Sequence, residues 1–267
     1  MAVGNGSYGA RRYRGRRKGR GSDRNILLRA AGRAAFFPLL LAYLELVLHI
    51  AMGMDLKYCV IYLLFALSMG CLFSALTMPF KRPVNRVLVK VLAVVISLLY
   101  VVEIIAKKIL QNFYSFSSLG MAAGNHLTDY TQVILSMVAR NIPLILVLLL
   151  PAILVIIFGN ATLRFPWTDV RFAGLMVVAA AVFHLLGLGA VHLPWGGDLT
   201  PKQLYRVDTN LDDQVEQLGL VTMLRLDVKH QFVPAGTLLD DDFTGLPVPP
   251  SAGPSDPAGE ESQDPAA

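Results

Sequence analysis

Five long apolar runs dominate the chain, and they predict membrane-spanning helices. They cover residues 34–54, 58–78, 87–106, 142–159 and 172–193. A bilayer core needs about 20 mostly apolar residues per helix, and each run meets this requirement. A single run of this kind is also compatible with a buried core helix, but five in succession argue against that interpretation. The pattern therefore predicts an all-α polytopic membrane protein with a domain of five transmembrane helices over residues 34–193.

Two segments outside these runs are predicted to be amphipathic. In residues 107–141, apolar positions recur at helical spacing near the end, which favours an outer segment lying on the membrane or between helices; a packing loop is an equal alternative. In residues 194–237, Thr209 or Asn210 is a suitable N-cap for a helix with Asp212 and Asp213 in its first turn. Its apolar residues follow at spacings of three and four: Leu211, Val215, Leu218, Val221, Leu224 and Val228. We expect this membrane-proximal linker helix to lie on the membrane surface or against the helix bundle.

Composition and charge exclude an ordinary soluble domain and distinguish the two ends of the chain. Hydrophobic residues make up 54%, charged residues only 16%, and the mean hydropathy is +0.53, whereas soluble domains average about 25% charged residues. The net charge of +5 conceals a basic segment at residues 1–33, with ten basic residues and one acidic residue, and an acidic region from Asp198 onward. We expect residues 1–33 to form a disordered cytoplasmic tail and residues 238–267 to form a disordered acidic, Pro-rich tail.

The distribution of Lys and Arg predicts the orientation in the membrane. A basic tract directly before an apolar run is typical of a cytoplasmic anchor near anionic lipid, so we favour membrane lipids over nucleic acid as partners. With the N-terminus inside, the inner segments carry fifteen basic residues and the outer loops carry four, which are Lys57, Lys107, Lys108 and Arg140. The sequence therefore predicts a multi-pass protein of the plasma membrane with a cytoplasmic N-terminus and an extracellular C-terminus.

Four acidic or histidine residues fall well inside the predicted spans, where charged groups are costly and hence suspected of a function. They are Glu45, His49, Glu103 and His184. Glu45 and His49 are four residues apart on one helix face, and all four fall near the middle or in the outer half of the predicted spans. Three interpretations remain open: a structural pair that fastens helices together, a lipid head-group site, and a proton or ion path.

No catalytic or metal-binding motif is visible. The sequence holds no Walker-type loop, no HExxH, no GxSxG and no paired-cysteine metal motif. We therefore predict no catalytic residue, no metal site and no cofactor on this chain.

Three stretches resemble the N-terminal membrane region of the lipoteichoic acid synthase family of Gram-positive bacteria. They are LAYLELVLHI (Leu41–Ile50), FYSFSSLG (Phe113–Gly120) and DDQVEQLGLVTMLRLDVK (Asp212–Lys229). The LGLVTMLRLD part of the third stretch is the most specific of the matches. The resemblance covers roughly residues 30–232.

This resemblance implies a role in cell wall biogenesis. The family's members are sulfatase-like phosphoglycerol transferases, which take glycerol phosphate from phosphatidylglycerol. Their membrane-proximal linker leads into an extracellular domain in which a threonine nucleophile and a manganese ion carry out the transfer. No position of this chain matches those catalytic residues, so we expect a module that is truncated before its catalytic domain and is inactive alone.

The sequence thus favours the membrane-anchoring module of a lipoteichoic acid synthase-like glycerolphosphate transferase. Its expected partners are membrane lipids such as phosphatidylglycerol, together with a separate catalytic domain or further copies of itself. The alternatives are a non-enzymatic accessory or scaffold protein of the cell envelope, and a small transporter. The absence of a repeat of spans argues against the transporter.

Overall fold

The described part of the chain is almost entirely helical. A computed structural model describes residues 32–113, 115, 131–162, 170–196, 199–207 and 210–232, and these residues contain no strand. The predicted all-α fold class is confirmed for them. Most of the two predicted disordered tails lies outside the described residues, as do residue 114 and residues 116–130 of the predicted outer segment.

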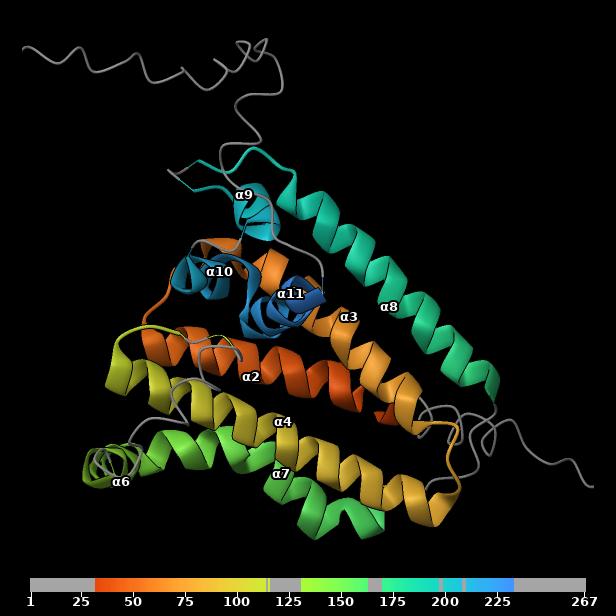
Figure 1. Ribbon diagram of the computed structural model, residues 1–267. Helices are drawn as coiled ribbons and strands as arrows, with labels where there is room; N and C mark the ends of the chain where they lie inside the picture. The colour runs from red at the N-terminus through yellow and green to blue at the C-terminus, as the bar shows by residue number, and fades with distance from the viewer. Residues whose placement is uncertain are drawn as a thin grey trace, which may run out of the picture.

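Five long helices lie side by side in the order α8, α3, α2, α4 and α7 (Figure 1). Their bounds are α2 Phe36–Met52, α3 Cys59–Thr77, α4 Arg82–Leu110, α7 Ile142–Thr162 and α8 Val170–Val191. The most extensive contact joins α3 to α8, and α2 packs against α3, α4 and α7. Helix α2 therefore lies at the centre of the bundle.

Short connections set the directions of the helices. Gly53 ends α2 in the left-handed conformation with φ 67°, and the short helix η1 (Leu56–Tyr58) leads directly into α3. Asp55 caps η1, because its carboxylate accepts the Lys57 N–H at 2.8 Å. Helix α6 (Thr131–Arg140) precedes α7 and is bent from it by 75°.

Three short helices follow the bundle and pack against one end of it. They are α9 (Pro201–Arg206), α10 (Leu211–Leu218) and α11 (Leu220–Phe232). Residues 199–207 and 210–232 are called the docked segment below. Both α10 and α11 contact α3 (Figure 1). Packing against the helix bundle is one of the two locations predicted for the linker.

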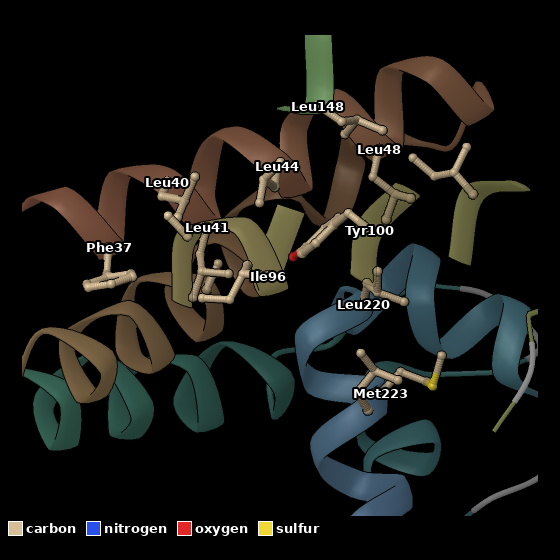
Figure 2. Packing of buried hydrophobic residues seen from close by; sticks show 14 of the residues in the cluster. Phe37, Leu40, Leu41, Leu44, Leu48, Ile96, Tyr100, Leu148, Leu220 and Met223 are labelled. Carbon is tan, nitrogen blue, oxygen red and sulfur yellow. The ribbon is translucent and has the colours of Figure 1, made fainter. Parts of the chain in front are cut away.

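The docked segment contributes to the main apolar core. Leu220 and Met223 of α11 are fully buried in the same cluster as residues of α2 and α4. Figure 2 shows this cluster, whose labelled members are Phe37, Leu40, Leu41, Leu44, Leu48, Ile96, Tyr100, Leu148, Leu220 and Met223. Since burying a large apolar side chain stabilises a fold by about 1.5–3 kcal/mol, α11 is held by packing as well as by polar contacts.

Several apolar helices suggest a membrane location. Three helices are long and apolar enough to cross a bilayer: Leu56–Thr77, Pro83–Leu110 and Arg171–Val191. The bent pair of α6 and α7 makes a fourth if it counts as one span, whereas α2 is apolar but has only 17 residues. Large apolar side chains are exposed along α4, α7 and α8, which is typical of faces that contact lipid.

Candidate functional site

Glu45 and His49 form a buried polar pair on α2. Their side chains are 1% and 0% exposed, and Glu45 Oε2 lies 3.8 Å from His49 Nδ1. The His49 ring stacks on Tyr62 of α3 with 3.8 Å between ring centroids. Nδ1 donates to the Glu45 carbonyl oxygen at 2.8 Å. The structure thus brings these two side chains together, as their spacing of four residues predicts.

The Glu45 carboxylate caps the N-terminus of α11. The N–H of Leu220 donates to Oε2 at 3.2 Å, and the N–H of Val221 donates to Oε1 at 3.0 Å. The first N–H groups of a helix have no partner within the helix, and a negative charge there interacts favourably with the helix dipole. Glu45 therefore fixes the start of α11 to the middle of α2.

His49 makes the complementary contact with the end of α10. Its Nε2 lies 3.2 Å from the carbonyl oxygen of Glu216, in the last turn of that helix. Carbonyl groups in a last turn lack partners within the helix and carry the negative end of its dipole. The pair on α2 thus binds the end of one helix and the start of the next.

Gly219 makes this junction between α10 and α11. Its φ is 86°, and a Cβ atom there would lie 2.8 Å from Tyr62 Cβ and 3.0 Å from Glu45 Oε1. Both the backbone conformation and the close approach require glycine. The single linker helix predicted from apolar spacing within 194–237 is therefore divided at Gly219, while Asn210 caps α10 as predicted, accepting the N–H groups of Asp212 and Asp213.

Replacing Gly219 with alanine is expected to loosen α11. An L-residue at this φ and ψ costs about 1–3 kcal/mol, and the new methyl group displaces the carboxylate that caps the helix. Because 1.4 kcal/mol corresponds to a tenfold change in an equilibrium constant, we expect the Leu220 and Val221 amides to exchange about tenfold faster or more. Hydrogen exchange of the detergent-solubilised protein measures this. Gly196→Ala is the control, because nothing lies within 4 Å of its Cβ position, and equal exchange rates in the two variants would contradict the prediction.

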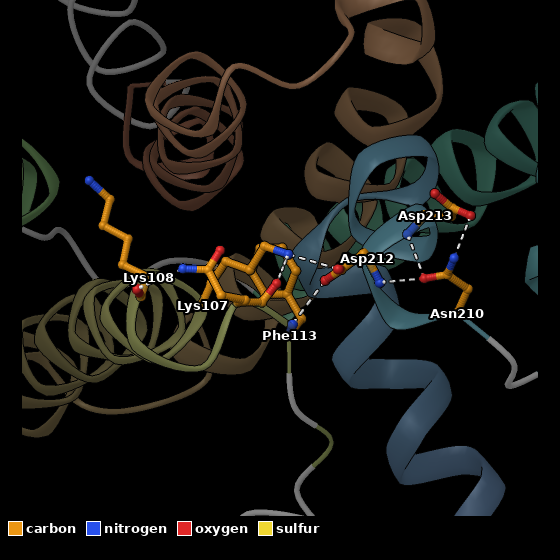
Figure 3. A network of polar contacts seen from close by, with 7 residues as sticks. Lys107, Lys108, Phe113, Asn210, Asp212 and Asp213 are labelled. Carbon is orange, nitrogen blue, oxygen red and sulfur yellow. Dashed lines mark hydrogen bonds and ion pairs between the residues drawn. The ribbon is translucent and has the colours of Figure 1, made fainter. Parts of the chain in front are cut away.

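A second attachment joins α10 to the end of α4. Lys107 Nζ lies 2.7 Å from Asp212 Oδ2, and the other carboxylate oxygen accepts the N–H of Phe113 at 2.9 Å (Figure 3). Lys107 Nζ also donates to the carbonyl oxygen of Gln111 at 2.6 Å. The ion pair is partly exposed, so it contributes modestly to stability. The ion pair mainly sets the position of α10, because it holds this helix beside the last turn of α4.

Glu103 and His184 do not join the Glu45–His49 pair, so no single cluster forms as the sequence had suggested. Glu103 on α4 is 3% exposed and interacts electrostatically with Asp227 of α11. His184 on α8 contacts Arg225 of α11, with Arg225 Nη1 lying 3.1 Å from Nε2. The four residues instead fall into three separate groups, and each group has an interaction with the docked segment.

Arg225 is the residue of this region that sequence reasoning missed. Its guanidinium donates to the Tyr205 hydroxyl at 2.8 Å and lies over the rings of Phe65 and Tyr205, 5.6 and 5.5 Å from their centroids. The sequence offered one signal, a basic residue inside the amphipathic stripe of the linker. The spacing of the apolar residues does not show which neighbour this side chain meets, because that depends on how α11 packs against α8 and α9.

Comparison with family models, curated proteins and solved structures finds no match to this chain.

Proposed function

We propose that the chain is a multi-pass module of the plasma membrane that holds its docked segment in a fixed orientation at the extracellular face. In this proposal α2, α3, α4, the α6–α7 pair and α8 are five crossings, and the N-terminus is cytoplasmic. Helix α2, with 17 residues, is at the lower limit of the length that spans a bilayer, about 17–25 residues.

The positions of the helix ends support this topology. The docked segment contacts the loop after α2 and the end of α4, because Asp55 N–H donates to Glu216 at 3.1 Å and Lys107 pairs with Asp212. Lys57 of η1, just before α3, donates to the carbonyl oxygen of Gly196, just beyond α8, at 3.2 Å. Alternating crossings place these ends on one side, and the excess of Lys and Arg on the opposite side favours that side as cytoplasmic.

The module's function would be to anchor and orient a glycerolphosphate transferase domain, joined to it or carried by a partner chain, as in the lipoteichoic acid synthase family. The observation that carries this proposal is the capping of α11 by the buried carboxylate of Glu45. An anchor that merely retains a domain at the membrane needs no such contact, whereas one that orients the domain needs a rigid junction. The manganese of that family belongs to the transferase domain, and we assign no residue of this chain to it.

The topology is tested by labelling single cysteines with a membrane-impermeant maleimide. With Cys59 and Cys71 replaced by serine, Lys202→Cys on α9 and Lys57→Cys are expected to react in intact cells. Lys81→Cys and Arg171→Cys are expected to react only after lysis. The reverse pattern would contradict the proposed orientation.

The orienting role is tested with the module fused to a phosphoglycerol transferase domain. We expect alanine at Glu45 and His49 to shorten or abolish the glycerolphosphate polymer while the fusion protein stays in the membrane. Normal polymer in these variants would leave anchoring alone as the role. Normal polymer with the whole module exchanged for an unrelated membrane anchor would favour an accessory protein instead.

A further inference from the structure

The Arg225 side chain carries a positive charge without a carboxylate partner in the described part of the chain. The ion pairs found there join His49 to Glu45 and Lys107 to Asp212, and neither includes Arg225. The guanidinium is partly buried among the rings of Phe65, Tyr205 and His184. Cation–π contacts offset only part of the cost of taking an unpaired cation out of water.

Arg225 and its neighbours have N–H and O–H groups that the observed contacts do not use, and these can donate to an anion. A guanidinium has five N–H donors, and the contacts observed are those to His184 and to the Tyr205 hydroxyl. Tyr205 accepts in its contact, so its own O–H hydrogen is left to donate. The three side chains come from α11, α8 and α9, and together they present N–H and O–H groups without a carboxylate among them.

A small, partly open cavity of about 40 Å³ adjoins this group. Arg225, His184 and Thr222 line one part of it, and Phe65, Met69 and Leu72 of α3 line another. A single water needs about 10–15 Å³ measured in this way, so the cavity accepts a group larger than one water. Leu72 is 44% exposed, so the apolar wall of the cavity continues onto the exposed surface of α3.

The cavity lies below the ends of its helices, at the depth of the lipid acyl chains in the proposed topology. Phe65 is six residues after the start of α3, and His184 is seven residues before the end of α8. At a rise of about 1.5 Å per residue, both lie about 10 Å from the ends of these helices. A basic group beside an apolar wall at this depth favours an amphiphilic anion over a soluble one.

We propose that Arg225, with His184 and Tyr205, binds the phosphate of a membrane phospholipid whose acyl chains lie along α3. The bound lipid neutralises the guanidinium and joins α11 to α8. This inference depends on the membrane location in the proposed function, and it does not depend on the transferase assignment.

The test measures lipid binding to the purified, delipidated chain in detergent by native mass spectrometry and by thermal stabilisation. Three probes separate the parts of the ligand: short-chain phosphatidylglycerol, diacylglycerol with the same chains, and glycerol 1-phosphate. We expect phosphatidylglycerol to bind at least tenfold more tightly than either of the other two. If diacylglycerol binds as tightly as phosphatidylglycerol, the site does not recognise the phosphate. If glycerol 1-phosphate binds as tightly as phosphatidylglycerol, the site binds a soluble phosphate ester and not a lipid. Either result would overturn the proposal.

The variants test the named residues. Arg225→Gln is expected to weaken phosphatidylglycerol binding about 10–100-fold, as the loss of a charge-assisted hydrogen bond predicts, and to leave diacylglycerol binding unchanged. Lys202→Gln is the control, because Lys202 is an exposed cation on α9, outside the residues that line the cavity. Tyr205→Phe keeps the ring that stacks on Phe65 and removes one hydroxyl, so we expect about 2–10-fold weaker binding even if Arg225→Gln does not fold. Binding by Arg225→Gln or by Tyr205→Phe equal to that of the unmodified protein would show that the group only packs α11 against the bundle.

The two proposals fail in distinguishable ways. A chain that leaves the membrane without detergent, or that labels with the reverse pattern, contradicts the proposed function. A chain that labels as expected but whose Arg225→Gln variant binds phosphatidylglycerol normally contradicts only the lipid site.

Discussion

Replacing Glu45 with alanine is expected to release α11 from the bundle. The substitution leaves the Leu220 and Val221 N–H groups without their acceptor and leaves His49 without the carboxylate 3.8 Å away. Removing one partner of a buried charged contact costs about 3–5 kcal/mol, and a change of 1 kcal/mol shifts the thermal midpoint of a domain of this size by roughly 2–4 °C. We therefore expect the midpoint in detergent to fall by roughly 6–20 °C, with the α11 amides losing protection first.

Two variants show whether this loss comes from the capping contact. Glu45→Gln keeps the shape and one oxygen acceptor but presents an amide NH₂ to the second N–H donor, so an intermediate decrease is expected. Leu46→Ala alters the adjacent side chain of α2, which is 37% exposed, and little change in α11 protection is expected. If Glu45→Ala lowers α11 protection no more than Leu46→Ala does, the capping contact does not hold the docked segment.

The location of the long helices was predictable because run length and hydropathy are local properties. The first and last residues of these helices were harder to predict. Helix α4 covers Arg82–Leu110, whereas the apolar run covers residues 87–106. Basic residues at both ends of α4 are good helix formers, so the helix continues past the apolar run that predicted it. Hydropathy locates the part of a helix that suits lipid, and it does not locate the helix ends.

The association of side chains from different helices was predictable only in part. The Glu45–His49 pair follows from spacing within one helix, and the Asn210 cap follows from local turn chemistry. Which face of α8 meets α11 depends on packing between distant segments, and periodicity does not encode it. This is why His184 was expected near Glu45 and lies instead against Arg225.

The break between α10 and α11 at Gly219 is also a feature that local sequence patterns do not predict. The apolar stripe from Leu211 to Val228 keeps its spacing of three and four through Gly219, so periodicity alone indicates one helix. Gly219 has a positive φ, and Tyr62 and Glu45 approach its backbone so closely that a Cβ atom does not fit. A tertiary contact therefore overrides a local pattern, and it does so at the residue on which the proposed rigid junction depends.

Replacing Gly70 with alanine is expected to separate α2 from α3, the second of the two largest effects. An added Cβ at Gly70 would lie 2.8 Å from the carbonyl carbon of Phe37 and would also contact the backbone of Pro38. These are backbone atoms, so a side-chain rotation cannot relieve the contact, and one helix must move from the other. Close approach through small residues is typical of helix pairs in membranes, and inserting a methyl group into a packed interface costs about 1–3 kcal/mol or more.

The measurement is the thermal midpoint in detergent together with hydrogen exchange of α2, α3 and α11. Gly174→Ala and Gly189→Ala on α8 are matched controls, because each adds the same methyl group to a helix with nothing within 4 Å of the Cβ position. They are expected to be neutral or stabilising by up to about 1 kcal/mol, since alanine favours a helix over glycine. We expect Gly70→Ala to lower the midpoint and to reduce protection mainly in the first half of α2, around Pro38, whereas Glu45→Ala reduces it mainly in α11. The same pattern of exchange in both variants would mean that the α2–α3 pair and the docked segment unfold as one unit. Glu45 would then stabilise the whole bundle instead of the junction alone.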